Sequence, residues 1–284
     1  MGKPGYINIR GRLVSLKTPR IMGIINITPD SFYKGSRYSD EKSILSAAEK
    51  MIGEGADFID IGGYSSRPGA GPVELEEEKN RVLPAIKLIL SKIPDAIISV
   101  DTFRASVARE AVCDCGADII NDISGGEADS EMFPLIKELN VPYILMHMQG
   151  TPATMQINPV YDDIVADILQ WFGKRIVALH SAGVKDLIID PGFGFGKSID
   201  QNFELLGRLK EFSLAALPLM AGLSRKSMVW KTLDTTPSDS LTGTIVLNTI
   251  ALLNGANILR VHDVKEARQA IQLVGRLKEA EAAE

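Results

Sequence analysis

Short apolar runs alternate along the chain with longer segments in which apolar residues recur at helical spacing. Most of the short runs are continuously apolar and rich in β-branched residues, which is typical of strands in a parallel sheet covered on both faces. We predict eight strands: Arg20–Ile27, Phe58–Gly62, Ala96–Asp101, Ile119–Ile123, Tyr143–His147, Leu187–Asp190, Leu219–Leu223 and Ile258–His262. We predict one helix after each strand: Glu41–Glu54, Leu75–Leu90, Arg104–Cys115, Glu131–Leu139, Asp162–Ala182, Asp200–Glu211, Ser240–Asn254 and Val264–Ala280.

Several of the helical segments carry end signals. Ser39-Asp40 stands before the first helix, where side-chain capping groups are common. A glycine followed by alanine or valine leads directly into a strand at four places, namely Gly55, Gly116, Gly183 and Gly255. Because glycine readily adopts the left-handed conformation that ends a helix, we expect each of these pairs to stop a helix and start the next strand.

The eight strand–helix units follow one another without a linker. This repetition favours an α/β fold of the (β/α)8 TIM-barrel type over a doubly wound open sheet, and 284 residues suit such a barrel as a single domain. We expect residues 20–284 to form the barrel. Residues 1–19 are expected to contain a short hairpin, from Tyr6 to Thr18, that covers the barrel's bottom.

Composition narrows the classes of function. The net charge of −5 without a basic block argues against nucleic acid as a partner. We expect no membrane span, because the longest nearly apolar stretch, Leu214–Leu223, is short and contains Pro218. Cys113 and Cys115 are too close in sequence to bridge readily, and the first twelve residues lack an apolar signal region; both fit a cytoplasmic location.

Polar residues gather at the predicted carboxyl ends of the strands, which is where such barrels carry their chemistry. Each one alone has a structural explanation as a cap or a turn residue. The glycine run at 192–196 does not match a phosphate-binding fingerprint, and His147 is as well explained by bridging loops. Polar residues at all eight strand ends nevertheless indicate one active site.

The chemistry of these residues divides into two kinds. The first set suits the edge of a flat polar heterocycle and consists of Asp101, Asn121, Asp190 and Lys226. Carboxylate and amide oxygens accept hydrogen bonds from ring N–H and amino groups, and the lysine donates to a ring carbonyl or nitrogen. Met146, Met148, Phe193 and Phe195 suit its apolar faces. A second set suits an anion and consists of Asn26, Arg67, Arg260 and His262. The amide oxygen of Asn26 is also a plausible Mg²⁺ ligand.

These segments resemble the signatures of the dihydropteroate synthases, in the same order, between about residues 20 and 270. The segments that carry the resemblance are Asn26–Phe32, Ser99–Thr102, Asn121–Ile123, Asp190–Lys197, Gly222–Lys226 and Arg260–Asp263. The resemblance implies a transferase of folate biosynthesis that condenses 6-hydroxymethyl-7,8-dihydropterin pyrophosphate with p-aminobenzoate. It also implies Mg²⁺ as cofactor, sulfonamides as inhibitors and a homodimer.

The resemblance further implies a role for each matching position. Asp101, Asp190 and Lys226 are expected to be catalytic. The pterin is expected to contact Asp101, Asn121, Met146, Asp190, Phe195 and Lys226. The pyrophosphate is expected to contact Asn26, Arg67, Arg260 and His262, with Asn26 also binding the metal. The p-aminobenzoate is expected to contact Phe32, Ser66, Pro68 and Ser227.

The chain departs from the family pattern in two loops. Many members have Glu-Ser-Thr-Arg-Pro where this chain has Tyr64-Ser65-Ser66-Arg67-Pro68, and a glycine-rich acidic turn where it has the basic segment Tyr33–Arg37. Two related functions stay open, a methyltetrahydrofolate–corrinoid methyltransferase domain and a pterin-binding paralogue without catalysis. A metal-dependent aldolase barrel is disfavoured, because only three histidines are present and His180 lies in a predicted helix.

Overall fold

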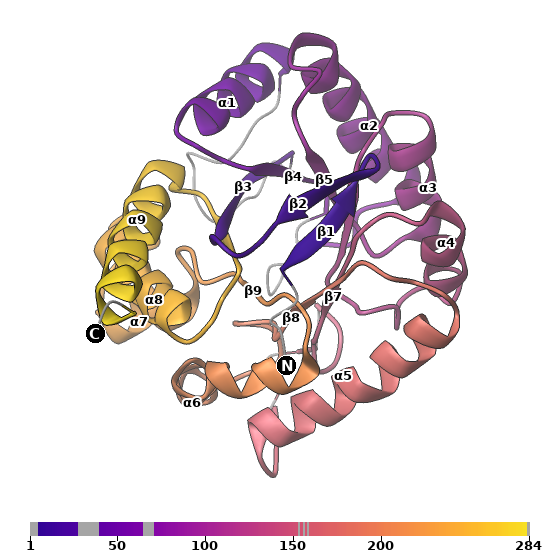
Figure 1. Ribbon diagram of the computed structural model, residues 1–284. Helices are drawn as coiled ribbons and strands as arrows, with labels where there is room; N and C mark the ends of the chain where they lie inside the picture. The colour runs from indigo at the N-terminus through magenta and orange to yellow at the C-terminus, as the bar shows by residue number, and fades with distance from the viewer. Residues whose placement is uncertain are drawn as a thin grey trace.

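A computed structural model describes residues 5–27, 40–64, 71–152, 154–155, 157 and 159–282. Eight parallel strands form one sheet in the order β8-β7-β6-β5-β4-β3-β10-β9. A bridge between Ile189 and Leu219 links the two ends of this sheet, which therefore curls into a nearly closed barrel (Figure 1). The predicted (β/α)8 barrel is confirmed. The strands are β3 (Arg20–Asn26), β4 (Phe58–Gly62), β5 (Ile98–Asp101), β6 (Ile119–Asp122), β7 (Tyr143–Met146), β8 (Leu187–Asp190), β9 (Met220–Ala221) and β10 (Ile258–Val261).

Helices surround the barrel between successive strands (Figure 1). They are α1 (Glu41–Gly53), α2 (Leu75–Lys92), α3 (Ala105–Cys113), α4 (Met132–Leu139), α5 (Ile164–Ser181), α6 (Ile199–Gly207), α7 (Ser227–Thr232), α8 (Leu241–Leu253) and α9 (Val264–Glu281). Two details differ from the prediction. The segment after α6 continues as a 3₁₀ helix, η2 (Leu209–Ala215), and α7 was not predicted because six residues are too few to show a helical period.

The predicted glycine stops are confirmed at all four positions. Gly55, Gly116, Gly183 and Gly255 have φ of 102°, 86°, 96° and 100°. After α1, Gly55 N donates to Ile52 O at 3.0 Å and Ala56 N donates to Met51 O at 2.8 Å. The left-handed glycine thus satisfies the last carbonyls of the helix and turns the chain into the next strand.

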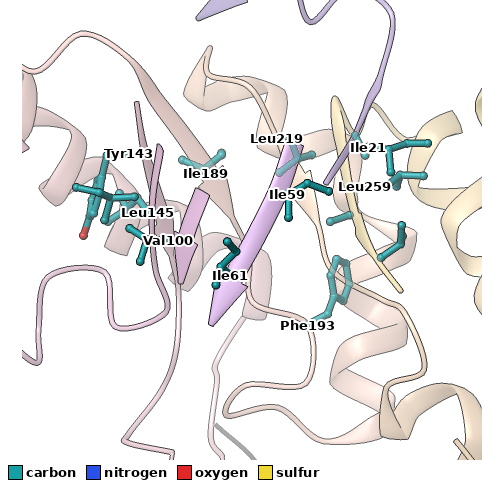
Figure 2. Packing of buried hydrophobic residues seen from close by; sticks show 14 of the residues in the cluster. Ile21, Ile59, Ile61, Val100, Tyr143, Leu145, Ile189, Phe193, Leu219 and Leu259 are labelled. Carbon is teal, nitrogen blue, oxygen red and sulfur yellow. The ribbon is translucent and has the colours of Figure 1, made fainter. Parts of the chain in front are cut away.

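The side chains of each strand alternate between the helices and the barrel interior. On β4, Ile59 and Ile61 belong to the core between the sheet and the helices, as does Val100 on β5 (Figure 2). Asp60 lies between those two isoleucines and therefore points inward. The same alternation turns inward Arg260 of β10 and the last residues of β5, β7 and β8, which are Asp101, Met146 and Asp190. Asn121, one position before the end of β6, points inward as well.

The inward side chains at the opposite end of the barrel are apolar. They form a second cluster with Ile7, Ile9 and Leu16, and the barrel residues of this cluster are Met22, Phe58, Ile119, Ile144, Ile188, Met220 and Ile258. Ile7 and Ile9 lie on β1 (Tyr6–Ile9), which pairs antiparallel with β2 (Arg12–Ser15) and crosses the ring of strands (Figure 1). The hairpin therefore closes the amino-terminal end, and the barrel interior is polar only at the carboxyl end.

No helix in the described part of the chain combines the length and the apolar character that crossing a bilayer requires.

Candidate active site

Four side chains from neighbouring strands form a buried polar network in the barrel mouth. Arg260 donates from Nε to Asp60 Oδ2 at 2.7 Å and from Nη2 to Asp101 Oδ2 at 2.6 Å. Asn121 Nδ2 donates to the same Asp60 oxygen at 3.1 Å. Asp60 and Asn121 are 0% and 2% exposed, so one buried carboxylate oxygen orients both a guanidinium and an amide.

Two oxygens of this network have no donor among the described residues. Asp60 Oδ1 and Asn121 Oδ1 are buried and have no hydrogen-bond partner among the residues that the structure describes. The amide orientation is fixed, because Asn121 must turn its nitrogen to a carboxylate that only accepts. A buried acceptor without a donor costs about 1 to 3 kcal/mol. The pair is therefore suited to a ligand that brings N–H groups.

Asp101 lies at the rim of this network. Burial raises the pKa of the Asp101 carboxyl to about 7, the positive charge of Arg260 opposes that rise, and the charge of Asp60 adds to it. Paired carboxylates with a shared cation are a common feature of functional sites. Asp101 therefore changes its charge close to neutral pH.

Asp190 and Lys226 lie on the other side of the mouth. Asp190 is 4% exposed, and its Oδ1 accepts from Gly192 N at 2.8 Å. Burial raises the pKa of Asp190 and the charge of Lys226 opposes this. Burial lowers the pKa of Lys226 to about 8, opposed by Asp190. Lys226 Nζ donates to Phe193 O and stands 4.6 Å from the centre of the Phe195 ring.

Apolar side chains form the remaining wall. The buried residues Ile123, Met146, Met148 and Met155 make one cluster, and Phe103 and Phe195 pack against it. Met146 is paired in register with Asp190, so the apolar wall adjoins the polar edge. Thioether and aromatic groups next to convergent polar groups are typical of a site for a flat heterocycle.

Of the predicted heterocycle residues, Asp101 and Asn121 share the network with Asp60, while Asp190, Lys226, Met146 and Phe195 form the facing side. Arg260, which we expected at the anion, lies among the carboxylates in the barrel instead. Asn26 ends β3 and is half-buried. His262 follows β10, and its backbone N donates to Ser224 Oγ at 3.2 Å. Ser227 begins α7, directly after Lys226.

Four predicted site residues lie outside the described residues: Phe32, Ser66, Arg67 and Pro68. The basic segment Tyr33–Arg37 lies outside them as well. Nothing in the structure therefore bears on the roles expected for these two loops.

Tyr64, which departs from the family pattern, contacts an aromatic ring and a guanidinium group. Its ring contacts Phe103 edge-on with centres 4.9 Å apart, and the Arg104 guanidinium lies 5.7 Å from its centre. Arg104 is ion-paired at 2.7 Å with the buried carboxylate of Glu78. Aromatic and cation–π contacts thus fix the tyrosine beside the apolar wall.

Asp60 was not among the site residues predicted from the sequence. A lone acid inside the apolar run Phe58–Gly62 was the available signal, because such a residue in a buried strand needs a specific partner. Asp122, in contrast, is polar but points away from the mouth. It accepts from Tyr143 Oη at 2.7 Å and from Gly126 N at 2.8 Å, and so it holds the turn after β6.

The barrel, with a polar edge and an apolar wall at its mouth, belongs to the family of pterin-binding enzymes. The sequence profile described as "Pterin binding enzyme" matches residues 22–262. Within that class the chain belongs with the dihydropteroate synthases, which are transferases of folate biosynthesis.

The similarity extends over nearly the whole chain. Dihydropteroate synthase of Escherichia coli K12 is 43% identical over 267 residues, which cover 93% of this chain and 94% of that one. The structure of Yersinia pestis dihydropteroate synthase with a sulfonamide drug complex has a TM-score of 0.92 and 40% identity, covering 96% and 99%. That of the Xanthomonas albilineans enzyme with 4-aminobenzoic acid has a TM-score of 0.88 and 37% identity, covering 96% and 98%.

Proposed function

We propose that the chain condenses 6-hydroxymethyl-7,8-dihydropterin pyrophosphate with p-aminobenzoate to give 7,8-dihydropteroate and pyrophosphate. The observation that carries this proposal is a pair of buried acceptors at the mouth of the barrel, Asp60 Oδ1 and Asn121 Oδ1, which have no donor among the described residues. A pterin has amino and ring N–H groups on one edge and supplies the missing donors. The overall similarity to dihydropteroate synthases supports the same reaction.

In this proposal the pterin ring lies between the network and the apolar wall. Asn121 and Asp190 accept from its N–H groups, and Lys226 donates to its carbonyl or to a ring nitrogen. Met146 and Phe195 contact its faces. The proposal thus assigns the heterocycle to the residues that the strands bring closest together.

The pyrophosphate is assigned to Asn26, Arg67 and His262. Asn26 ends β3 and His262 follows β10, both at the carboxyl end of the barrel, and Arg67 comes after β4 in the sequence. Arg260 has its Nε and Nη2 on carboxylates, so we place it between the pterin and the anion rather than on the anion alone. A guanidinium in that position adds positive charge beside the departing group.

The residues present fit a Mg²⁺ ion that the substrate brings with it. No group of three or more acidic, histidine or cysteine ligands occurs in the described ranges, whereas Asn26 offers one amide oxygen at the mouth. Magnesium in phosphate-transfer sites commonly has one or two protein ligands, with phosphate oxygens and water completing the shell. When bound, the ion would neutralise charge on the pyrophosphate.

The chemistry follows from these placements. The bond between the pterin methylene carbon and the pyrophosphate oxygen breaks, and its electron pair leaves with the pyrophosphate. The conjugated pterin spreads the positive charge that remains, and the Asp101 carboxylate stabilises it. The amine of p-aminobenzoate then bonds to the methylene carbon and loses one proton. No covalent intermediate with a protein side chain is needed.

For p-aminobenzoate we propose Phe32, Ser66, Pro68 and Ser227 as contacts. Ser227 supports this assignment, because it is adjacent to Lys226 and half-buried at the start of α7. The Yersinia pestis relative has been solved with a sulfonamide, so we propose that sulfonamides compete with p-aminobenzoate here as well.

We further propose a homodimer built on α8 and α9. Val246 and Leu253 lie two turns apart on α8 and are 52% and 48% exposed. Leu273 and Leu277 lie one turn apart on α9 and are 72% and 48% exposed. Exposed apolar side chains gathered on two packed helices are typical of an oligomer contact. We place this dimer in the cytoplasm, in keeping with the free thiols of Cys113 and Cys115.

Incubation of the protein with the pterin pyrophosphate, Mg²⁺ and labelled p-aminobenzoate tests the reaction. Labelled dihydropteroate is the expected product. Binding of the pterin without any product would contradict the proposal and indicate a non-catalytic pterin-binding protein. Lys226→Ala is the matched variant, since loss of a donor at the pterin edge should raise the pterin Kd; an unchanged Kd would remove Lys226 from that edge.

A further inference from the structure

Lys197 is a buried lysine that the proposed chemistry does not use. It follows the glycine-rich segment 192–196 and is 2% exposed. Its Nζ lies 3.2 Å from His147 Nδ1, 3.0 Å from Gly192 O and 2.9 Å from Phe195 O. An ammonium group has three N–H donors, so these three acceptors use all of them.

His147 is held in one state by this contact. Burial lowers the pKa of Lys197 to about 7. In its ammonium form Lys197 donates to His147 Nδ1, so the ring is neutral and carries its proton on Nε2. Burial, reinforced by the charges of Lys197 and Arg175, lowers the pKa of His147 to about 2. The ring also packs edge-on against Trp171 with centres 5.1 Å apart. Lys197 thus donates to an acceptor that is itself fixed.

The segment 192–196 lies directly on the chain around His147. Gly192 has φ of +73°, and a Cβ there would stand 1.9 Å from His147 O. Gly196 has φ of +62°, and a Cβ there would stand 2.6 Å from Gln149 O. Only glycine fits both the conformation and the space. The turn therefore packs closely against the loop that follows β7, and the hydrogen bonds of Lys197 join the two segments.

The front of the same turn faces the candidate active site. Gly192 N donates to Asp190 Oδ1 at 2.8 Å, and Phe193 O accepts from Lys226 Nζ. The Phe195 ring lies 4.6 Å from that ammonium. Gly192 and Phe195, the two residues whose carbonyls accept from Lys197, thus also contact Asp190 and Lys226.

We propose that Lys197 is a positioning residue, whose three hydrogen bonds to His147, Gly192 and Phe195 fix the 192–196 turn and thereby set Asp190 and Lys226 for the heterocycle. This inference rests on the proposed function, because it concerns affinity for the pterin. It assigns a role to Gly192, Gly196 and His147, none of which contacts the pterin in the proposed arrangement.

The test compares Lys197→Met, which keeps the length of the side chain and removes its donors, with wild type. We expect the Kd for the pterin pyrophosphate to rise about tenfold, or about 1.4 kcal/mol, while the KM for p-aminobenzoate stays within about twofold. Lys210→Met, at an exposed lysine of η2, is the control and should leave both constants unchanged. An unchanged pterin Kd, or an equal rise in both constants, would overturn the proposal.

A milder pair covers the case in which Lys197→Met does not fold. His147→Asn keeps an acceptor on Cγ, where Nδ1 stood, and should bind the pterin nearly as wild type does. His147→Leu removes that acceptor and should bind about threefold more weakly. Equal affinities in the two variants would overturn the proposal.

Amide hydrogen exchange at Gly192 and Phe195 separates this inference from the proposed function. We expect faster exchange at both amides in His147→Leu than in His147→Asn, whether or not the wild type binds a pterin. Equal exchange rates would contradict the proposal that the hydrogen bonds of Lys197 fix the 192–196 turn. A wild type that neither binds the pterin nor forms product would overturn the proposed function alone.

Discussion

Asp60 accepts from Arg260 and Asn121 on a single oxygen, and its second oxygen is buried with no donor among the described residues. A buried acceptor without a partner is costly, because it loses its hydration. The arrangement becomes favourable when a ligand supplies N–H groups. At the residue scale, the proposed pterin site therefore depends on carboxylates as well as on cations.

Replacing Asp60 by asparagine should weaken this arrangement. The amide keeps the shape but loses the charge that faces Arg260, and we expect unfolding to become easier by about 3 kcal/mol. We also expect the pterin Kd to rise about tenfold. Urea unfolding and equilibrium binding measure the two effects. Asp200→Asn, on the exposed first turn of α6, is the control, and an Asp60→Asn protein with wild-type affinity would disprove the assignment.

The pH dependence of turnover follows from two pKa values in the mouth. Asp101, with its pKa raised to about 7, stabilises the pterin cation only when ionised, so kcat/KM should fall as the pH drops below that value. Lys226, with its pKa lowered to about 8, donates best as an ammonium, so kcat/KM should fall as the pH rises above that value. A profile from about pH 5.5 to about pH 9.5 measures both limbs.

Asp101→Asn is the control for the acidic limb. If the limb below about pH 7 belongs to this carboxyl, it should disappear in the variant. A limb that persists unchanged would belong to the substrate, and a flat wild-type profile would contradict both assignments.

At the scale of elements, the sequence predicted every strand of the barrel and every helix except α7, because the apolar periods of those elements are long and unbroken. It also predicted polar side chains at the strand ends, and the structure has Asp101, Asn121, Asp190 and Lys226 at or near those ends, where polar residues interrupt apolar runs. It missed Asp60, since a single acid within a strand does not change the apolar pattern, and its contact with Arg260 spans strands distant in sequence. The short helix α7 was not predicted, because it has too few residues to show a helical period.

The N-terminal hairpin supplies stability without touching the site. Ile7 is 1% exposed and packs in the apolar cluster at the end opposite the mouth. Ile7→Ala should lower the free energy of unfolding by about 2 to 4 kcal/mol and leave the KM of both substrates unchanged. Urea denaturation measures the first and steady-state kinetics the second. Leu13→Ala, at a site 73% exposed on β2, should cost far less, and equal losses would refute the packing.

At the scale of the whole molecule, a net charge of −5 surrounds a mouth lined with Arg260 and Lys226. Local cations outweigh a weak overall charge at short range, so an anionic substrate is compatible with this balance. Helices α8 and α9 lie on the outside of the barrel (Figure 1), and their exposed apolar side chains therefore offer a proposed dimer contact separate from the mouth.

Sedimentation tests the proposed dimer. The wild-type protein should sediment with twice the mass of one chain. The double variant Leu273→Glu with Leu277→Glu should sediment closer to the mass of the monomer, because each charge buried in an apolar contact is costly. Leu214→Glu, at a residue 78% exposed on η2, should leave the mass unchanged. A wild type that sediments as a monomer would rule the dimer out.

The most direct test of the central claim is a single-turnover experiment with bound pterin pyrophosphate, Mg²⁺ and labelled p-aminobenzoate. Wild type is expected to form labelled dihydropteroate. Asp101→Asn is expected to bind the pterin pyrophosphate but to form product at least about tenfold more slowly, a loss of about 1.4 kcal/mol in transition-state stabilisation. A wild type that binds without forming product, or a variant within about threefold of its rate, would contradict the account.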